Sequence, residues 1–245
     1  MVSLAELKRT IAFAQSHAVE YVCLTGLNLY QSPACASLVT QAAAGRHLRP
    51  VSMPNSPGPN SPGSEISAIE VCLCEDNYPG WLALTDLQQL AIAEIPYQPI
   101  SLSFEDIQAR LSDVIAFTQT AMAQPNHYLW GGTIGPHYDC SGLIQVAFAS
   151  VGISLPRDSY QQEAFTHPIP LDALQPGDLI FFGSPEKTTH VALYLGKGDY
   201  IHSSGKDQGR NGIGIDSLSN LSHPVSQAYS RQLRGAGRVM TSYPY

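Results

Sequence analysis

Three features are scarce in this sequence: basic residues, long apolar runs and the elements of a targeting segment. The chain has 13 Lys+Arg against 20 Asp+Glu, and its formal net charge of -7 makes it a poor candidate for binding nucleic acid or an anionic membrane. No stretch approaches the roughly 20 consecutive apolar residues that span a bilayer. The N-terminal segment lacks the basic region, the unbroken apolar core and the cleavage site of a signal peptide. We therefore expect a cytoplasmic protein with neither a nucleic-acid partner nor a membrane partner.

Cysteines are few, and their number is odd. The five are Cys23, Cys35, Cys72, Cys74 and Cys140. An odd count in a chain of this length argues against a disulfide framework. Cys72 and Cys74 stand one residue apart in an apolar run, so on a strand both point to one face, and we expect two buried small hydrophobic residues. A zinc site of the usual kind needs a second such pair, which the sequence lacks. We expect neither a metal nor a cofactor.

The chain divides at a proline-containing segment into two predicted domains. Hydrophobic residues make up 44% and charged residues 13% of the 245 residues, a composition typical of a globular protein. Segment 91–101 contains two prolines and is interpreted as a linker. Segment 51–64 is rich in Pro, Gly, Ser and Asn and is interpreted as a flexible loop between two strands. We predict an N-terminal domain over 1–101 and a C-terminal domain over 102–245.

The N-terminal domain begins with a predicted amphipathic helix, because Leu4, Leu7, Ile11 and Ala14 recur at helical spacing. Short apolar runs separated by turn residues then stand on both sides of the loop, which is typical of a small all-β unit. These runs are EYVCLTG and NLYQS before the loop, and AIEVCLC and GWLALTDL after it.

The C-terminal domain opens with a helix predicted from Phe104 to about Met122. Ser103 can cap this helix, with Asp106 as its partner in a capping box. A second helix begins at or near Cys140, and three strand-like runs follow it: DLIFFG, HVALYLG and YIHSS. The apolar stripe of the second helix comprises Leu143, Ile144, Ala147 and Phe148. This order of elements favours an α+β domain with an antiparallel sheet.

A cysteine that opens a helix and two histidines on the following strands form a candidate catalytic set. Cys140 meets the positive end of the helix dipole and unpaired N–H groups, which both favour the thiolate. His190 starts one strand and His202 ends the next run, so that a hairpin can place them side by side. We predict Cys140 as the nucleophile, His190 as its general base and His202 as the group that orients His190. The backbone N–H of Cys140 can then contribute to an oxyanion hole.

Each of these residues has an ordinary structural alternative when it is considered alone. A cysteine that opens a helix is commonly structural, and a histidine in a strand is commonly a hydrogen-bonded core residue. The joint occurrence of one cysteine and two histidines in this order is much harder to explain by chance. The pattern therefore favours catalysis by a cysteine.

The motifs around these residues resemble the NlpC-type cell-wall cysteine peptidases, a papain-like family. The resemblance covers about residues 105–240 and implies a papain-like domain with Cys140, His190 and His202 as catalytic residues. It also implies hydrolysis of amide bonds in the stem peptides of peptidoglycan, typically the bond between γ-D-glutamate and a diamino acid such as diaminopimelate. The matching motifs are Tyr128-x-Trp130-Gly131-Gly132, Asp139-Cys140-Ser141-Gly142-Leu143, Leu155-Pro156-Arg157 with Ser159 and Gln162, Leu174-x-Pro176-Gly177-Asp178-Leu179, and His190-Val191-x-x-Tyr194.

The N-terminal domain resembles a bacterial SH3-like β-barrel over about residues 18–95. The resemblance rests on LNLYQSPACASLVTQAAAGRHLRPV, in which strands alternate with a Ser/Pro loop and a Gly turn, and more weakly on YPGWLALTDL. A domain of this kind ahead of the peptidase domain is a known arrangement in the family. Any other small β-barrel is the alternative interpretation.

Residues beside the catalytic set are candidates for binding the substrate. Asp139 is a predicted helix N-cap and, in addition, a carboxylate that can pair with the free amino group of the substrate's L-Ala. Ser141 could assist, with a solvated serine in the first turn as the alternative. Arg157 and Ser159 could reach the D-glutamate carboxylate, and Arg157 could equally form a structural ion pair. Trp130 could line the groove or pack under the glycine turn.

Two residues of the N-terminal domain are further candidates. Glu75 and Tyr78 lie in a turn-like segment that carries two carboxylates and two aromatic residues. We predict that they close the far end of the groove, with an ordinary solvated loop as the alternative. A closed groove requires a short substrate with a free N-terminus, which is a product of wall turnover. The predicted substrate is therefore L-Ala-γ-D-Glu-diaminopimelate, cleaved during cell-wall recycling.

Three other functions stay open at this point. An inactive muropeptide-binding module would bind a stem peptide without cleaving it, although the intact Cys140 and both histidines argue against that function. A thiol amidase or acyltransferase on the same scaffold would differ in its products. A zinc hydrolase would need a third ligand beside His190 and His202, and none stands at a convincing spacing.

Overall fold

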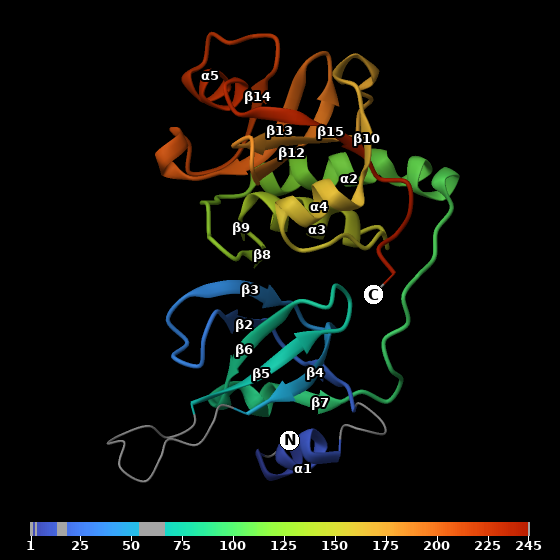
Figure 1. The fold of residues 1–245 in the computed structure, drawn as a ribbon, viewed down its shortest axis with the longest axis vertical. Helices are drawn as coiled ribbons and strands as arrows, with labels where there is room; N and C mark the ends of the chain where they lie inside the picture. Colours follow the sequence, from blue (N-terminus) through green and yellow to red (C-terminus); the bar gives the residue numbers. More distant parts are fainter. Residues whose placement is uncertain (1, 3, 14–18, 54–66, 245) are drawn as a thin grey trace. The chain divides into compact units, whose positions relative to one another are not determined.

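The computed structural model describes residues 2, 4–13, 19–53 and 67–244 of the chain. These residues fold as two compact units, Met1–Gln98 and Pro99–Pro244, and each unit has a hydrophobic core of its own (Figure 1). The division falls inside the proline-containing segment 91–101.

The N-terminal unit is an antiparallel β domain whose seven strands follow the order β3-β2-β6-β5-β4-β1-β7. Its strands are short, and alternate side chains enter the core, as where Leu27 and Leu29 are buried and Asn28 between them is exposed. The elements are α1 (Leu4–Phe13), β1 (Tyr21–Cys23), β2 (Leu27–Tyr30), β3 (Leu38–Ala42), β4 (His47–Ser52), β5 (Ala68–Leu73), β6 (Pro79–Ala83), the 3-10 helix η1 (Leu84–Gln89) and β7 (Leu90–Ile92).

Most of the elements predicted for this unit are present. The four apolar runs coincide with β1, β2, β5 and β6 to within one residue at the start of each strand, and the end of the fourth run lies in η1. In α1, Leu7 is buried and Leu4 packs against the core, whereas Ala14 lies outside the described residues. Cys72 and Cys74 are both buried, and all five cysteines of the chain are free thiols.

Two predicted boundaries in this unit were wrong. Residues 91 and 92, assigned to the linker, belong to β7, where Ala91 pairs with Val22 of β1. Such a pairing depends on a strand far away in the sequence, which local composition does not reveal. Residues 51 and 52, assigned to the flexible loop, complete β4. The remainder of that predicted loop, from residue 54 onward, lies outside the described residues.

The C-terminal unit is an α+β domain built on an antiparallel sheet with the strand order β10-β15-β11-β12-β13-β14. A two-stranded hairpin precedes the sheet. The elements are α2 (Phe104–Ala123), β8 (Thr133–Ile134), β9 (His137–Tyr138), α3 (Cys140–Ala149), α4 (Ser159–Phe165), β10 (His167–Ile169), η2 (Leu171–Ala173), β11 (Leu179–Gly183), β12 (Thr188–Gly196), β13 (Asp199–Ser204), η3 (Lys206–Gln208), β14 (Gly212–Ser217), α5 (Pro224–Ser230) and β15 (Leu233–Arg238).

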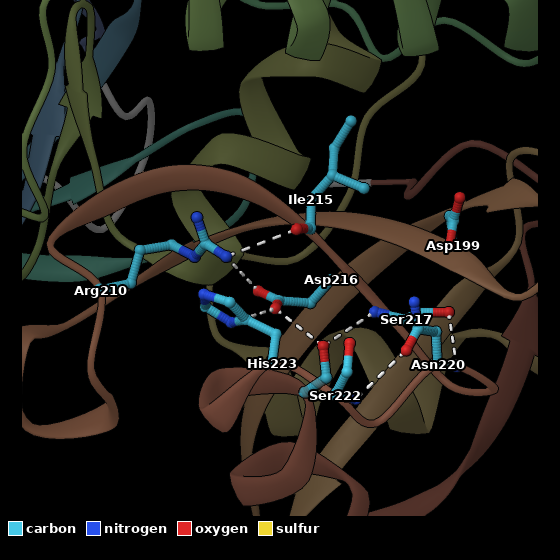
Figure 2. Close-up of a pocket in the computed structure, with 9 residues that line it drawn as sticks. Asp199, Arg210, Ile215, Asp216, Ser217, Asn220, Ser222 and His223 are labelled. Carbon is cyan, nitrogen blue, oxygen red and sulfur yellow. Dashed lines mark hydrogen bonds and ion pairs between the residues drawn. The ribbon is translucent and has the colours of Figure 1, made fainter.

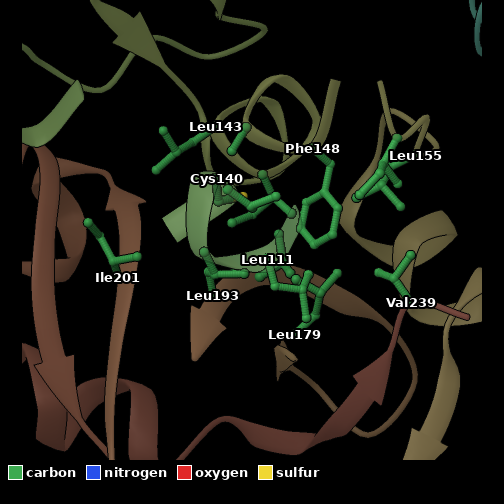
Figure 3. Close-up of a cluster of buried hydrophobic side chains, with 14 of the residues drawn as sticks. Leu111, Cys140, Leu143, Phe148, Leu155, Leu179, Leu193, Ile201 and Val239 are labelled. Atoms are coloured by element: carbon green, nitrogen blue, oxygen red, sulfur yellow. The ribbon is translucent and has the colours of Figure 1, made fainter. Parts of the chain in front are cut away.

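The sheet separates two apolar clusters. Leu179 and Phe181 of β11 pack with α2 and α3, whereas Ile180 and Phe182 pack with Val225 and Tyr229 of α5 on the opposite face. Helices α2 and α3 accordingly lie on one side of the sheet and α5 on the other (Figure 1). The larger cluster includes Cys140 (Figure 3).

The two helices predicted for this unit are confirmed. In α2 the Ser103 side chain accepts a hydrogen bond from the Asp106 N–H, and the Asp106 carboxylate accepts one from the Ser103 N–H, which completes the predicted capping box. Helix α3 begins at Cys140 with Asp139 as its N-cap. Its predicted stripe is fully buried and comprises Leu143, Ile144, Ala147 and Phe148.

Candidate active site

Helix α3 begins against the backbone of the preceding loop, and this contact fixes the position of Cys140. Asp139 caps the helix, because its Oδ1 accepts a hydrogen bond from the Gly142 N–H at 2.6 Å. A Cβ atom at residue 142 would lie 2.1 Å from the carbonyl oxygen of Gly132, so this approach of helix to loop requires glycine. The Gly131 N–H donates to Asp139 Oδ2 at 2.9 Å. The two glycine-containing motifs are therefore joined directly beside Cys140.

The thiol of Cys140 is buried at the first residue of α3, where it is 6% exposed. Backbone hydrogen bonds from Val191 and Ser141 reach it, and Val191 follows His190 directly in β12. The thiol therefore lies beside the strand that carries the predicted base. The N–H groups of the first helical turn have no acceptor within the helix, and that of Cys140 is available to a developing oxyanion.

Behind His190 the structure contains a chain of three polar side chains. His190 Nε2 and His202 Nδ1 are 2.7 Å apart, and His202 Nε2 is 2.9 Å from Asp216 Oδ2. His190 is 6% exposed, and the side chains of His202 and Asp216 are 0% and 1% exposed. Because Nε2 of His190 is bound to His202, its Nδ1 is the ring nitrogen left to serve the Cys140 thiol. The predicted pairing of the two histidines is present.

Burial disfavours an isolated charge on either member of the reacting pair. Burial, followed by the charge of Asp139, raises the pKa of the Cys140 thiol to about 12, although the two backbone donors and Arg157 act in the opposite direction. Burial, followed by the proximity of His202, holds the pKa of His190 well below its usual value. Burial therefore favours the neutral thiol of Cys140 and the neutral imidazole of His190.

Asp216 supplies a fixed negative charge at the end of the chain. Burial alone would raise the pKa of its carboxyl, but hydrogen bonds from His202, Ser226 and Arg210 bring it down to about 2. Arg210 Nη2 donates to Oδ2 at 2.6 Å, and Ser226 Oγ donates to Oδ1 at 2.9 Å. Burial also lowers the pKa of His202, an effect that Asp216 partly offsets.

Aromatic rings hold the His190 imidazole in place. Tyr229 of α5 stacks on it with the ring centroids 4.4 Å apart, and the ring of Phe182 lies 5.8 Å away. The Tyr229 hydroxyl shares a hydrogen bond of 2.7 Å with Ser204 Oγ. These contacts restrict the rotation of the imidazole about its side-chain bonds, which a general base requires.

A cleft of about 250 Å³ lies beside His190 and offers space for a substrate. Trp130 is 69% exposed and lines this cleft, so the alternative of packing under the glycine turn does not describe it. Its role in substrate binding stays a prediction. The lining residues are Tyr128, Trp130, Thr189, His190, Gly205, Asp207, Gln208, Tyr229 and Gln232.

Arg157 forms an ion pair with Asp139, which was one of the two alternatives for this arginine. Its Nη2 lies 2.6 Å from Asp139 Oδ2, and its Nη1 donates to Asp139 Oδ1 at 3.1 Å and to Ser141 Oγ at 3.0 Å. Ser141 is buried, so it is not the solvated serine of the alternative interpretation. Four N–H donors surround the Asp139 carboxylate, and its direct pairing with a substrate amine, which stays a prediction, has to compete with them.

Ser159 is the first residue of α4 and is 8% exposed. Helix α4 lies against the start of α3, because Gln162 Nε2 donates to the carbonyl oxygens of Ser141 and Pro156 at 3.1 and 2.9 Å. Ser159 is thereby placed near the catalytic helix, and its contact with the substrate stays a prediction.

Comparison with known proteins assigns both units. Residues 125–234 match the NlpC/P60 family, and residues 29–87 match the bacterial dipeptidyl-peptidase Sh3 domain family. The C-terminal unit is an NlpC/P60 domain. The family expected from the motifs around Cys140 is thus confirmed, together with the SH3-like character of the N-terminal unit.

The matched residues of the chain span about a fifth to a quarter of the length of the curated relatives. The probable endopeptidase p60 of Listeria monocytogenes is 37% identical over 112 residues, which are 46% of this chain and 21% of that protein. The gamma-D-glutamyl-L-lysine dipeptidyl-peptidase of Bacillus subtilis is 43% identical over 79 residues, which are 31% of this chain and 27% of that protein. A crystal structure of an NlpC/P60 family protein from Bacillus cereus aligns at 23% identity with a TM-score of 0.47, over 95% of this chain and 66% of that one.

Two predicted site residues lie outside the NlpC/P60 domain, in the SH3-like unit. Glu75 Oε1 accepts a hydrogen bond from the His47 N–H at 2.7 Å, and its Oε2 accepts one from Arg46 Nε at 3.2 Å. The Tyr78 N–H donates to Asp76 Oδ1 at 3.2 Å. Both residues are half-buried within their own unit. Their place at the end of the peptide groove stays a prediction.

Asp216, which ends the polar chain of the NlpC/P60 domain, is not among the predicted site residues. Ile213 and Ile215 alternate in this strand, and that pattern predicts an outward-facing Asp216. Toward the end of β14 the structure has the reverse arrangement, because Ile215 is 41% exposed and Asp216 is 4% exposed. A carboxylate in the strand that follows the two histidine strands was the available signal.

The described ranges 2, 4–13, 19–53 and 67–244 contain no group of three His, Cys, Asp or Glu side chains arranged as metal ligands. No helix within them is long and apolar enough to cross a membrane.

Proposed function

We propose that the protein is a cysteine peptidase that hydrolyses an amide bond in the stem peptides of peptidoglycan. The observation that carries this proposal is the placement of the Cys140 thiol, which lies at the start of α3 and accepts a backbone hydrogen bond from Val191. Val191 directly follows His190, whose Nε2 is bound to His202. The thiol supplies the nucleophile, His190 Nδ1 takes its proton, and the helix start offers N–H donors to an oxyanion.

The reaction follows from these positions. The thiol proton moves to His190 Nδ1 as the sulfur attacks the carbonyl carbon, and the resulting oxyanion accepts a hydrogen bond from the Cys140 N–H. The His190 imidazolium then protonates the leaving amine, the C–N bond breaks and a thioester forms on Cys140. Water attacks the thioester after giving its proton to His190, and the departing thiolate takes that proton back. His202 keeps His190 in one orientation throughout.

The cleft beside His190 is suited to the leaving group. The residue that protonates a leaving amine has to be within hydrogen-bond reach of it, so the diamino acid product lies on the His190 side of Cys140. The cleft is lined there by the exposed ring of Trp130 and by Asp207. An acidic residue is compatible with the ammonium group of a diamino acid side chain.

For the substrate we propose L-Ala-γ-D-Glu-diaminopimelate, cut between D-glutamate and the diamino acid. The name of the Bacillus subtilis relative, a gamma-D-glutamyl-L-lysine dipeptidyl-peptidase, supports a bond of this type. A requirement for a free N-terminal L-Ala belongs to the same proposal, with Asp139 and Glu75 as candidate partners of the amine. Such peptides are fragments of wall turnover, which places the enzyme in cell-wall recycling.

The test is a product analysis by mass spectrometry with the free tripeptide and with its N-acetylated form. We expect release of L-Ala-γ-D-Glu from the free peptide and little release from the blocked one, with no release by Cys140→Ala. Equal cleavage of both forms would remove the requirement for a free N-terminus and leave the peptidase. Binding without cleavage would favour a muropeptide-binding module, and transfer of the acyl group to an added amine would favour an acyltransferase.

A further inference from the structure

The carboxylate of Asp216 lies at the junction of the catalytic chain and a second cavity. This cavity has a volume of about 410 Å³ and opens on the side of the sheet that carries α5. Figure 2 shows Asp216 between Arg210 and His223, with its carboxylate directed toward both. The cavity therefore exposes the groups around Asp216 to solvent, while the carboxylate itself is 1% exposed.

We propose that Asp216 is a positioning residue of the peptidase: it holds the proton of His202 on Nε2 and, through His202, the proton of His190 on Nε2, so that Nδ1 of His190 stays free for the Cys140 thiol. The inference rests on the proposed function and adds a residue that acts on the reacting atoms only through two other side chains.

The proton positions follow from the donors along the chain. Asp216 is an anion and can only accept, so the hydrogen bond of 2.9 Å to His202 requires a proton on His202 Nε2. A neutral His202 then has a lone pair on Nδ1, and the contact of 2.7 Å to His190 requires a proton on His190 Nε2. A neutral His190 is left with its lone pair on Nδ1. One buried carboxylate therefore sets the tautomers of both rings.

Arg210 and Ser226 keep Asp216 in this role. The Arg210 guanidinium has only donors, and its Nη2 donates at 2.6 Å to Asp216 Oδ2, the oxygen that also binds His202. Ser226 Oγ accepts a hydrogen bond from the Ser217 N–H at 3.2 Å and donates its own proton to Asp216 Oδ1. These donors hold the carboxylate as an anion, so no proton passes to Asp216 during the reaction. Its charge instead favours the imidazolium that forms on His190.

Asp216→Asn distinguishes the effect of the negative charge at residue 216 from its effect on the proton positions of His202 and His190. An amide group has to turn its carbonyl oxygen toward Arg210, because its NH₂ group there would face a charged donor. The same oxygen faces His202, so Asp216→Asn keeps both tautomers and removes only the negative charge. Asp216→Leu removes the acceptor as well, and the proton of His202 is then no longer fixed.

The experiment compares kcat, KM and the pH profile of kcat/KM on the tripeptide. For Asp216→Asn we expect kcat to fall about 10-fold to 100-fold with little change in KM, and the profile to move about one pH unit lower. For Asp216→Leu we expect a loss closer to the roughly 10⁴-fold effect of a wrong tautomer in a Ser-His-Asp triad. Ser222→Ala is the matched control, an exposed residue of the same cavity, and should stay within about twofold.

Arg210→Gln should move the pH profile of kcat/KM in the opposite direction. This variant should also fold more readily than the Asp216 variants, since the Arg210 side chain is 24% exposed. Loss of this positive charge should move the profile to higher pH, because the imidazolium becomes easier to form. A purely structural role of Asp216 would not produce shifts of opposite sign. The charged and titratable groups that face Asp216 are His202, Tyr200, Arg210, His223 and Tyr229, with Asp199 in the same cavity.

A measurement on the unaltered protein tests the tautomers without any variant. Imidazole ¹⁵N NMR of the neutral protein should show both histidines protonated at Nε2 and bare at Nδ1. A proton on Nδ1 of His202 would overturn the proposal, as would an Asp216→Asn enzyme with the activity and the pH profile of Ser222→Ala. If the wild-type protein cleaved no stem peptide, the proposed function would fail, whereas the NMR result would still decide the proton positions.

Discussion

Replacing Arg157 by methionine tests whether this residue supports the catalytic helix or binds the substrate. The guanidinium is the charged partner of Asp139, with the side chains 1% and 9% exposed, and it also donates to Ser141. Methionine keeps most of the side-chain volume and removes all of these donors. Asp139 is then a buried anion that keeps the N–H groups of Gly142 and Gly131 and the more distant Ser141 hydroxyl as donors.

The expected loss of stability follows from that unpaired charge. Removal of one partner from a buried ion pair costs about 3–5 kcal/mol, and the two remaining backbone donors place this case near about 3 kcal/mol. For a domain of about 150 residues, this corresponds to a drop in Tm of about 6–12 °C. Asp139 and Arg157 contact each other, so the effects of replacing them should not add. The double variant Asp139→Asn with Arg157→Met should lose about 1–3 kcal/mol less free energy of unfolding than the two single variants together.

The assay is urea unfolding of the four proteins in this cycle, with Arg110→Met as the matched control. Arg110 is half-buried, and its Nη1 donates to the carbonyl oxygen of Val151 at 2.7 Å, so its loss should cost about 1 kcal/mol. Alkylation of Cys140 should also slow in Arg157→Met, since the positive charge that lowers the pKa of the thiol is lost while the charge of Asp139 stays. If Arg157→Met were as stable as Arg110→Met and only KM rose, Arg157 would be a substrate ligand and the structural account would be wrong.

Three further results are expected. The pKa of the Asp216 carboxyl is about 2 in the folded protein and about 3.9 in the unfolded chain. This difference adds about 2 kcal/mol to the free energy of unfolding above pH 4, and the contribution is lost as the pH falls to 2. Asp216→Asn should lack this loss of stability in acid. Burial lowers the pKa values of His190 and His202 in the folded protein, so these imidazoles bind protons at a higher pH in the unfolded chain. The free energy of unfolding should therefore fall as the pH drops below about 6.5. The fall should be less steep in His202→Gln. Trp130→Ala should raise KM about tenfold with kcat within about threefold and unfolding unchanged, and a fall in kcat alone would contradict its place in the cleft.

Helix α3 and the two histidines of the candidate site could be predicted from the sequence because the signals are local. Cys140 stands directly after a capping residue and before an apolar stripe with helical spacing, and the structure confirms that helix. His190 and His202 lie on consecutive strands, so a short hairpin was sufficient to bring His190 Nε2 and His202 Nδ1 to a separation of 2.7 Å.

The parts that were missed depend on contacts between distant segments. Asp216 is buried because His202 and Arg210 bind it, while its neighbour Ile215 is exposed, and no periodicity of the strand shows this. Likewise β7 extends into the predicted linker because Val22 pairs with Ala91. In both places a partner elsewhere in the chain decides the conformation, and a short window of sequence does not contain that partner.

The central claim is that Cys140 carries the acyl group of the substrate, and trapping that intermediate tests it most directly. Wild-type protein would be mixed with L-Ala-γ-D-Glu-diaminopimelate, quenched in acid within a single turnover and mapped by mass spectrometry. We predict an L-Ala-γ-D-Glu thioester on Cys140 and on none of the other four cysteines, with free diaminopimelate released in equal amount. Cleavage of the tripeptide by Cys140→Ala at the wild-type rate, or turnover in wild type through an adduct on another residue, would contradict the account.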